Sequence, residues 1–313
     1  MKSEVTMRVV SLLPSATEII CALGAKGELV GISHECDFPD DIRDRPVLTS
    51  ARIASHASSK AIDTAVREVV RDALSIYAVD EEKLAALAPD VIVTQDLCEV
   101  CAVSLDDVRR AVTRLAHRDA VEIVSLSPTR LGHVWNDIET VAKALGRAER
   151  GSEVRRELEA RTQAIAVRAA QAASRPRVVS IEWLDPIMLG GTWMPELIEL
   201  AGGVAVGARP GAIAPTVSPS ELAALAPDVV IVKPCGFTVE RTMQERDIVE
   251  SIAAAAGHGA RVYVSDGNAF FNRPGPRLVE SLEITAACVH PELFADFAEK
   301  HAGVIQAVRT STA

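Results

Sequence analysis

The chain has 313 residues, of which 48% are hydrophobic and 24% are charged, so it can bury a core of one large domain or two smaller ones. Its formal net charge is −10, and lysines and arginines form no cluster. A nucleic-acid-binding protein needs a basic face, so this class is excluded, and an acidic protein with a small-molecule or protein partner remains.

The first part of the chain alternates short apolar runs with helix-forming segments. Two helices are expected, one closed by Gly24 and one stopped by Pro89, because these residues end helices. Strands that are almost wholly apolar and separated by helices indicate a parallel sheet covered on both faces, which is an α/β fold. The expected strands are Val9–Leu13, Leu29–Ile32, Val91–Thr94 and Val121–Leu126, and the expected helices are Thr17–Leu23 and Glu81–Ala88.

Two longer helices are expected in the middle of the chain, Leu131–Leu145 and Glu149–Ala173. The second carries an apolar stripe and would span roughly 37 Å at about 1.5 Å per residue. That length favours a rigid connection over a flexible tether. We therefore expect an N-terminal lobe of residues 1–128, connecting helices over 129–174 and a C-terminal lobe of residues 175–313.

The sequence contains an internal repeat. The segment Leu84–Val91 recurs letter for letter at Leu222–Val229, and in each copy an apolar run and then a cysteine follow. Two further matches occur in the same order in both halves, Arg8–Ser11 with Arg177–Ser180 and Glu18–Gly24 with Glu196–Gly202. Three matches in register indicate two related lobes.

Targeting signals and cysteine usage bear on the compartment. No apolar run approaches the ~20 residues that span a bilayer, and Met1–Arg8 has none of the features of a signal peptide. Six cysteines are too sparse for a disulfide scaffold. We expect a cytoplasmic protein, or a periplasmic or cell-surface protein if an export signal has been removed.

Several segments together resemble one family. Arg8–Glu18, Gly31–Pro39, the Leu-x-Pro-Asp-Val pattern of both halves and Asn268–Arg277 resemble the helical-backbone substrate-binding proteins of ABC importers for cobalamin and iron chelates. The resemblance covers nearly the whole chain and is nearest to the cobalamin-binding branch. It implies two α/β lobes joined by a long helix, with a ligand cleft between the lobes.

The resemblance also implies a partner. Members of this family dock on a permease through one acidic residue on each lobe. Here the first lobe offers Glu82, whereas the corresponding position of the second lobe is Ser220, followed by Glu221. An ABC permease contacted through Glu82 and Glu221 is therefore the expected protein partner.

Thiols and an imidazole follow the predicted strands of both lobes. Ligands of parallel sheets lie at the carboxyl ends of the strands, and thiolates with imidazole suit zinc, copper(I) or iron–sulfur centres. Three interpretations remain open: a metal or corrinoid-cobalt site, packing of small apolar side chains, and redox chemistry. The candidate metal ligands are His34, Cys36, Cys98, Cys101 and Cys235, with zinc or iron as the metal of this cluster.

The few aromatic residues gather in predicted loops of the second lobe. Flat apolar rings around a few polar groups suit a large, partly apolar ligand such as a corrin ring, although packing between domains is the alternative. At the start of the first helix, backbone N–H groups are expected to hold an anionic group or only to be capped. The candidate ligand-binding residues are Trp183, Trp193, Phe237, Phe270, Phe271, Asn272, Arg273 and Ser15.

These features predict a binding protein and not an enzyme, since the chain contains no nucleophile elbow, phosphate loop or dinucleotide fingerprint. The expected ligand is cobalamin or a related corrinoid or iron chelate, held for uptake or intracellular delivery. The alternative is a metal-binding protein or metalloenzyme that uses the cluster of His34, Cys36, Cys98 and Cys101.

Overall fold

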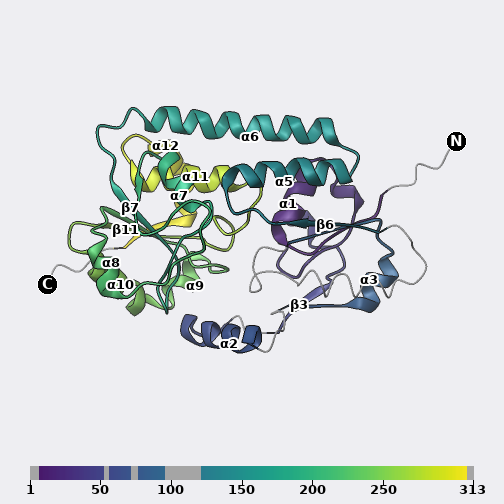
Figure 1. Ribbon diagram of the computed structural model, residues 1–313, viewed down its shortest axis with the longest axis horizontal. Helices are drawn as coiled ribbons and strands as arrows, with labels where there is room; N and C mark the ends of the chain where they lie inside the picture. Colours follow the sequence, from purple (N-terminus) through teal and green to yellow (C-terminus); the bar gives the residue numbers. More distant parts are fainter. Residues whose placement is uncertain (1–6, 53–55, 72–76, 96–120, 309–313) are drawn as a thin grey trace. The chain divides into compact units, whose positions relative to one another are not determined.

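The computed structural model describes residues 7–52, 56–71, 77–95 and 121–308 (Figure 1). The chain divides into two compact units, each described separately below. Unit 1 comprises Met1–Ala57, Thr64–Pro128 and Gly132–Glu157, and unit 2 comprises Ser58–Asp63, Thr129–Leu131 and Leu158–Ala313. The predicted division at residues 128 and 174 stays a prediction, as does the ligand cleft.

Unit 1 is built on a four-stranded sheet in the order β2-β1-β5-β6, with all neighbouring strands parallel. The expected parallel α/β sheet is therefore confirmed. Its strands are β1 (Val9–Ser11), β2 (Leu29–Gly31), β5 (Val91–Gln95) and β6 (Glu122–Leu126). A separate antiparallel pair consists of β3 (Thr49–Ala51) and β4 (Tyr77–Val79).

The helices of unit 1 follow the predicted segments closely. Helix α1 begins three residues before the expected Thr17, because Pro14 suits the first helical turn, where its missing N–H is not needed. Asp80 caps α3 by accepting a 3.0 Å hydrogen bond from the Lys83 N–H. The helices are α1 (Pro14–Ala22), α3 (Glu81–Leu87) and α5 (Leu131–Ala144), with short 3-10 helices at Lys26–Glu28 and Asp40–Ile42.

Three helices contain a boundary between the units. Helix α2 (Ser59–Arg71) begins in a segment grouped with unit 2, and the first residue of α5, Leu131, is also grouped with unit 2. Helix α6 (Ala148–Ala169) passes from unit 1 to unit 2 after Glu157. Helix α6 ends before the predicted Ala173. Residues 170–174 contain no large apolar side chain, so they have no packing that would stabilise another helical turn.

Unit 2 contains a six-stranded sheet in the order β12-β11-β10-β7-β8, with β9 also paired to β7. The central strands β11, β10 and β7 are parallel, whereas β12 and β8 are antiparallel to their neighbours. The strands are β7 (Arg177–Trp183), β8 (Met188–Leu189), β9 (Val204–Ala205), β10 (Val229–Val232), β11 (Arg261–Ser265) and β12 (Ile305–Val308).

Helices cover both faces of this sheet. In Figure 1, α7, α11 and α12 lie above the strands of unit 2, and α8, α9 and α10 lie below them. The helices are α7 (Met194–Leu200), α8 (Pro219–Ala224), α9 (Val239–Met243), α10 (Arg246–Ala256), α11 (Leu278–Val289) and α12 (Ala295–Lys300), followed by a 3-10 helix at Ala302–Val304.

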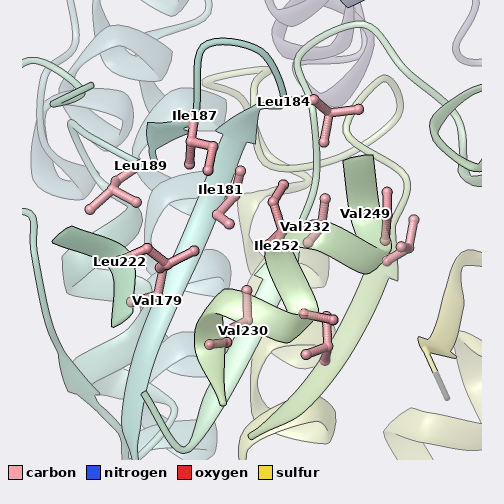
Figure 2. Packing of buried hydrophobic residues seen from close by; sticks show 14 of the residues in the cluster. Val179, Ile181, Leu184, Ile187, Leu189, Leu222, Val230, Val232, Val249 and Ile252 are labelled. Atoms are coloured by element: carbon pink, nitrogen blue, oxygen red, sulfur yellow. The ribbon is translucent and has the colours of Figure 1, made fainter. Parts of the chain in front are cut away.

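The main apolar core of unit 2 lies between the sheet and helices α8 and α10. Alternate strand residues such as Val179, Ile181, Val230 and Val232 point into it and meet helix residues such as Ile252 (Figure 2). Residues at the intervening positions of β7 and β10 therefore face α7 and α11. This alternation decides on which face of the sheet each polar residue at the strand ends lies.

The two units repeat one local structure. The Arg8 N–H donates to Asp90 Oδ2 at 2.8 Å, and the Arg177 N–H donates to Asp228 Oδ2 at 2.7 Å. The Arg8 guanidinium also donates to the Leu87 carbonyl at the end of α3. In the same way, the Arg177 guanidinium donates to the Leu225 carbonyl at the end of α8. After each of these helices an alanine has a positive φ, 43° in one unit and 44° in the other. The repeat predicted from sequence is therefore confirmed.

Within the described ranges, no helix combines the length and the apolar character that a bilayer span requires.

Candidate functional site

Three polar residues meet at the carboxyl ends of the central strands of unit 2. Lys233, directly after β10, is fully buried, and its Nζ lies 3.4 Å from Glu182 Oε2 and 3.1 Å from Asn272 Oδ1. Glu182 and Lys233 occupy strand positions that face α7 and α11, and Asn272 comes from the loop before α11. Strand β7, the residue that follows β10 and the loop that follows β11 thus supply one polar cluster.

The loop after β11 is held by hydrogen bonds at a strained residue. Phe271 has a φ of 64°, which an aromatic side chain rarely adopts. The Trp193 indole donates to the Phe271 carbonyl at 2.8 Å, and the Phe271 N–H donates to Ser281 Oγ at 2.9 Å. A residue keeps such a conformation where the surrounding contacts hold it in place. Here the hydrogen bonds of Trp193 and Ser281 to the Phe271 backbone also fix the position of Asn272, the next residue.

The remainder of this loop carries a buried cation and a half-buried ring. Arg273 is 7% exposed and donates to Asn268 Oδ1 at 3.3 Å. Burial raises the pKa of the Asp266 carboxyl. The carboxylate accepts hydrogen bonds from the N–H groups of Asn268 and Ala269, and these bonds oppose the shift. Phe270 lies beside His301, with 6.1 Å between ring centroids.

An aromatic pair lies on the opposite face of the sheet. The rings of Trp183 and Phe237 are 5.3 Å apart, and the Arg241 guanidinium lies 4.0 Å from the Phe237 centroid. The Trp183 indole donates to the Ser59 carbonyl at 3.2 Å. Glu245 in turn accepts from the Ser59 N–H at 2.9 Å and from its hydroxyl at 2.5 Å.

These contacts locate the predicted aromatic residues. Trp193, Phe237 and Phe271 are buried, at 5%, 4% and 0% exposure, and pack within unit 2. Trp183 and Phe270 remain partly exposed. Ligand contact by any of these rings stays a prediction, and the two partly exposed rings are the ones that a ligand can reach in this conformation.

In unit 1, His34 follows β2 and is held by its neighbours. Its Nδ1 lies 2.6 Å from Thr49 Oγ1, and its ring meets the Tyr77 ring edge-on at 5.1 Å. The Tyr77 hydroxyl donates to Glu35 Oε1 at 2.7 Å. Partial burial lowers the pKa of His34, and the charge of Glu35 opposes that shift. With Nδ1 engaged, Nε2 is the ring nitrogen left for a further ligand.

The described cysteines form no metal centre. Cys36 is buried, with its Sγ 3.1 Å from Thr17 Oγ1, and Cys235 is partly exposed after β10. Cys98 and Cys101 lie outside the described residues. Among the residues that the structure describes, no three His, Cys, Asp or Glu side chains are placed to hold a metal ion. Zinc or iron at the cysteines therefore gains no support.

Three further predicted residues lie near helix starts. Ser15, in the first turn of α1, is buried, and its Oγ has no hydrogen-bond partner within the described part of the chain. Glu82 is exposed on α3. Glu221 Oε2 accepts from the Ser218 N–H and hydroxyl, and these bonds hold the pKa of Glu221 below its usual range. The predicted roles of all three stay predictions.

Sequence reasoning did not single out Lys233, Ser59, Glu245 or Tyr77. The only signal for Lys233 was a lysine directly after an apolar strand, a position at which ligand-site residues of parallel sheets occur. Ser59 and Glu245 are far apart in the chain, and no sequence pattern connects them.

The comparisons with known proteins agree with this fold. A family described as periplasmic binding protein matches residues 9–267. The periplasmic heme-binding protein RhuT from Roseiflexus sp. RS-1 aligns with a TM-score of 0.66 and 22% identity, over 94% of this chain and 99% of that protein. A periplasmic heme-binding protein from Pseudomonas aeruginosa aligns with a TM-score of 0.68 and 18% identity, over 97% of this chain and 95% of that protein.

The periplasmic vitamin B12-binding protein BtuF of Vibrio cholerae aligns with a TM-score of 0.62 and 20% identity, over 90% of this chain and 96% of that protein. At these identities the likeness establishes the fold. No protein with a curated description matches the sequence.

The family and these neighbours are described as binding proteins and not as enzymes, in agreement with the expectation from sequence. The family is periplasmic by description, so the expected cytoplasmic location gains no support. The resemblance seen in the sequence is confirmed: this chain belongs to the family of periplasmic binding proteins.

Proposed function

We propose that this protein binds a metal tetrapyrrole, a corrinoid such as cobalamin or a heme, and delivers it in the periplasm to an ABC permease. The names of its structural neighbours support this class, since they bind heme or vitamin B12. Cobalamin is the ligand that we favour, because the sequence resemblance is nearest to that branch. The metal belongs to the ligand and is cargo, not a resident cofactor.

The observation that carries the proposal is the placement of His34. Thr49 Oγ1 lies 2.6 Å from Nδ1 and fixes the imidazole ring, and it also accepts the His34 N–H at 3.0 Å. Metal-binding histidines characteristically use one ring nitrogen for such a positioning contact and the other for the metal. In this arrangement Nε2 would bind cobalt or iron of the incoming chelate as an axial ligand.

The exposed acidic residues support delivery to a permease. Glu82 lies on α3 and Glu221 on α8, and these helices are the corresponding copies of the repeated segment. Glu221 is one residue beyond the position that corresponds to Glu82, so each helix carries an acidic residue near its start, which suits a partner with matching basic residues. Charge-reversal variants Glu82→Lys and Glu221→Lys should therefore lose transport in a reconstituted importer and keep ligand affinity.

The first experiment is a titration of the purified protein with aquocobalamin and, separately, with hemin, followed by visible spectrum and heat. We expect saturable one-to-one binding of one of them, with a shift of the metal-sensitive bands. His34→Ala should abolish the shift and weaken binding. His258→Ala is the control, because His258 is exposed in unit 2. Failure of the wild-type protein to bind either compound would contradict the proposed function.

A further inference from the structure

Lys233 is a fully buried lysine whose burial the proposed function does not by itself explain. An ammonium group removed from water is costly unless charged and polar partners compensate it. Two partners are present, Glu182 Oε2 at 3.4 Å and Asn272 Oδ1 at 3.1 Å. Because the ammonium has no exposed surface, it supports these two side chains and does not meet a ligand itself.

Solvent reaches Glu182, whose side chain is 24% exposed, and Asn272 is partly exposed as well. Glu182 Oε2 receives the Gly191 N–H at 3.3 Å in addition to Lys233. Its Oε1 has no hydrogen-bond partner among the described residues. The Gly191 N–H and the Lys233 ammonium hold Oε2 in place, so Glu182 presents Oε1 as an oriented acceptor at the carboxyl ends of the strands.

The backbone around the cluster leaves little freedom to rearrange. The Asn272 Nδ2 donates to the Gly267 carbonyl at 2.8 Å and to the Lys233 carbonyl at 3.4 Å, which directs Oδ1 to the ammonium. A Cβ on Gly267 would lie 2.1 Å from the Pro234 carbonyl oxygen, so this loop approaches β10 as closely as only glycine allows. The acceptor at Glu182 is thus preorganised.

We propose that Glu182 determines ligand specificity by accepting a hydrogen bond from an N–H donor on the edge of the chelate. The ligand class is then a metal chelate with carboxamide side chains. A chelate whose side chains are carboxylates would place negative charge against an oxygen that can only accept. This inference rests on the proposed function and names the class of metal chelate that the protein would bind.

The test measures dissociation constants of the wild-type protein for cyanocobalamin, whose side chains are carboxamides, for a corrinoid monocarboxylic acid that differs at one such group, and for hemin, which carries carboxylates. Cyanocobalamin should bind most tightly. Among the monocarboxylic acid isomers, one should bind at least about 10-fold more weakly, because a charge-assisted hydrogen bond is replaced by repulsion.

The matching variant is Glu182→Gln, which keeps the shape and removes the charge. It should bind cyanocobalamin about 10-fold more weakly and bind the affected monocarboxylic acid more tightly than the wild type does. Glu250→Gln, on exposed α10, is the control and should change neither constant. Circular dichroism establishes that each variant is folded, and the wild-type comparison of isomers stands if Glu182→Gln does not fold.

The outcomes separate the two proposals. Tighter binding of hemin than of cyanocobalamin, or equal binding of all monocarboxylic acid isomers and cyanocobalamin, overturns the role of Glu182 and leaves a tetrapyrrole-binding protein. An unchanged ratio of affinities in folded Glu182→Gln overturns it as well. If the wild-type protein binds no tetrapyrrole, the proposed function fails and this inference fails with it.

Discussion

The indole of Trp193 donates a 2.8 Å hydrogen bond to the backbone carbonyl of Phe271, and this contact joins the start of α7 to the loop after β11. Phe271 has a φ of 64°, so the loop depends on such contacts to hold an unfavourable conformation. Asn272 follows directly and meets Lys233. The Trp193 hydrogen bond therefore stabilises the polar cluster from a distance.

Trp193→Phe should lower the free energy of unfolding by about 1 kcal/mol more than Trp135→Phe does, because both lose ring volume and only the first leaves a buried carbonyl without its donor. Trp135 is the matched control, with 4% exposure against 5% for Trp193. Urea denaturation followed by circular dichroism gives the difference. Equal losses in the two variants would mean that the hydrogen bond contributes nothing.

Gly267→Ala should destabilise the protein by about 3 kcal/mol, because the new Cβ would lie 2.1 Å from the Pro234 carbonyl oxygen and 2.5 Å from that of Lys233. Neither backbone atom can move without displacing β10. Gly259→Ala is the control, since a Cβ there meets open space, and it should change stability by less than about 0.5 kcal/mol. Thermal and urea unfolding of both variants test this, and similar stabilities would refute the close approach.

Glu245→Gln should loosen the start of α2. The Glu245 carboxylate accepts both the N–H and the hydroxyl of Ser59, and charge-assisted hydrogen bonds are about twice as strong as neutral ones. Amide hydrogen exchange in a peptide covering residues 58–66 should become about 10-fold faster. Glu250→Gln should leave it unchanged, because Glu250 is exposed on α10. Unchanged exchange in Glu245→Gln would contradict the proposed anchoring.

The sheets and the repeat could be predicted because their signals are local. Apolar β-branched runs such as Val229–Val232 became buried parallel strands, and the identical segments at Leu84 and Leu222 became equivalent helices. Even the positive φ at Ala88 and Ala226 repeats. These features depend on residues within one short segment, so sequence pattern was sufficient.

The polar cluster could not be predicted in the same way. A lysine is expected at the surface, and the burial of Lys233 depends on Glu182 and Asn272, which lie 51 and 39 positions away in the chain. Likewise, Trp193 and Phe271 were predicted to contact a ligand, but both side chains are buried, and the Trp193 indole donates to the Phe271 carbonyl. Only the tertiary structure decides which side chains at the strand ends are covered.

The last prediction concerns acid stability and Glu283, a buried carboxylate on α11. It accepts hydrogen bonds from Arg161 at 3.0 Å, Lys300 at 2.6 Å and His301 at 2.8 Å. Burial by itself raises the pKa of Glu283, but these three donors outweigh it and lower the pKa from 4.5 to about 2. Glu280, one helical turn earlier, accepts a further bond from Arg161 at 3.0 Å.

A pKa that is lower in the folded state stabilises the fold above the pKa of the unfolded state and loses that effect as pH falls. The window here runs from about pH 5 down to about pH 2. At about 1.4 kcal/mol per pKa unit, the contribution at neutral pH is about 3 kcal/mol. Glu283→Gln should therefore lower the free energy of unfolding by about this amount at pH 7, and the difference from wild type should shrink steadily below pH 5.

Urea unfolding of wild type and Glu283→Gln at pH 7, 5 and 3.5 measures this difference. Glu280→Gln is the matched control, because it removes a carboxylate from the same arginine at a more exposed position, 22% against 6% for the side chain of Glu283. Its effect should be below about 1 kcal/mol, as for other exposed ion pairs. A Glu283→Gln difference that stays constant from pH 7 to pH 3.5 would show that this carboxylate does not titrate with folding. In that case another acidic group would have to account for any loss of stability in acid.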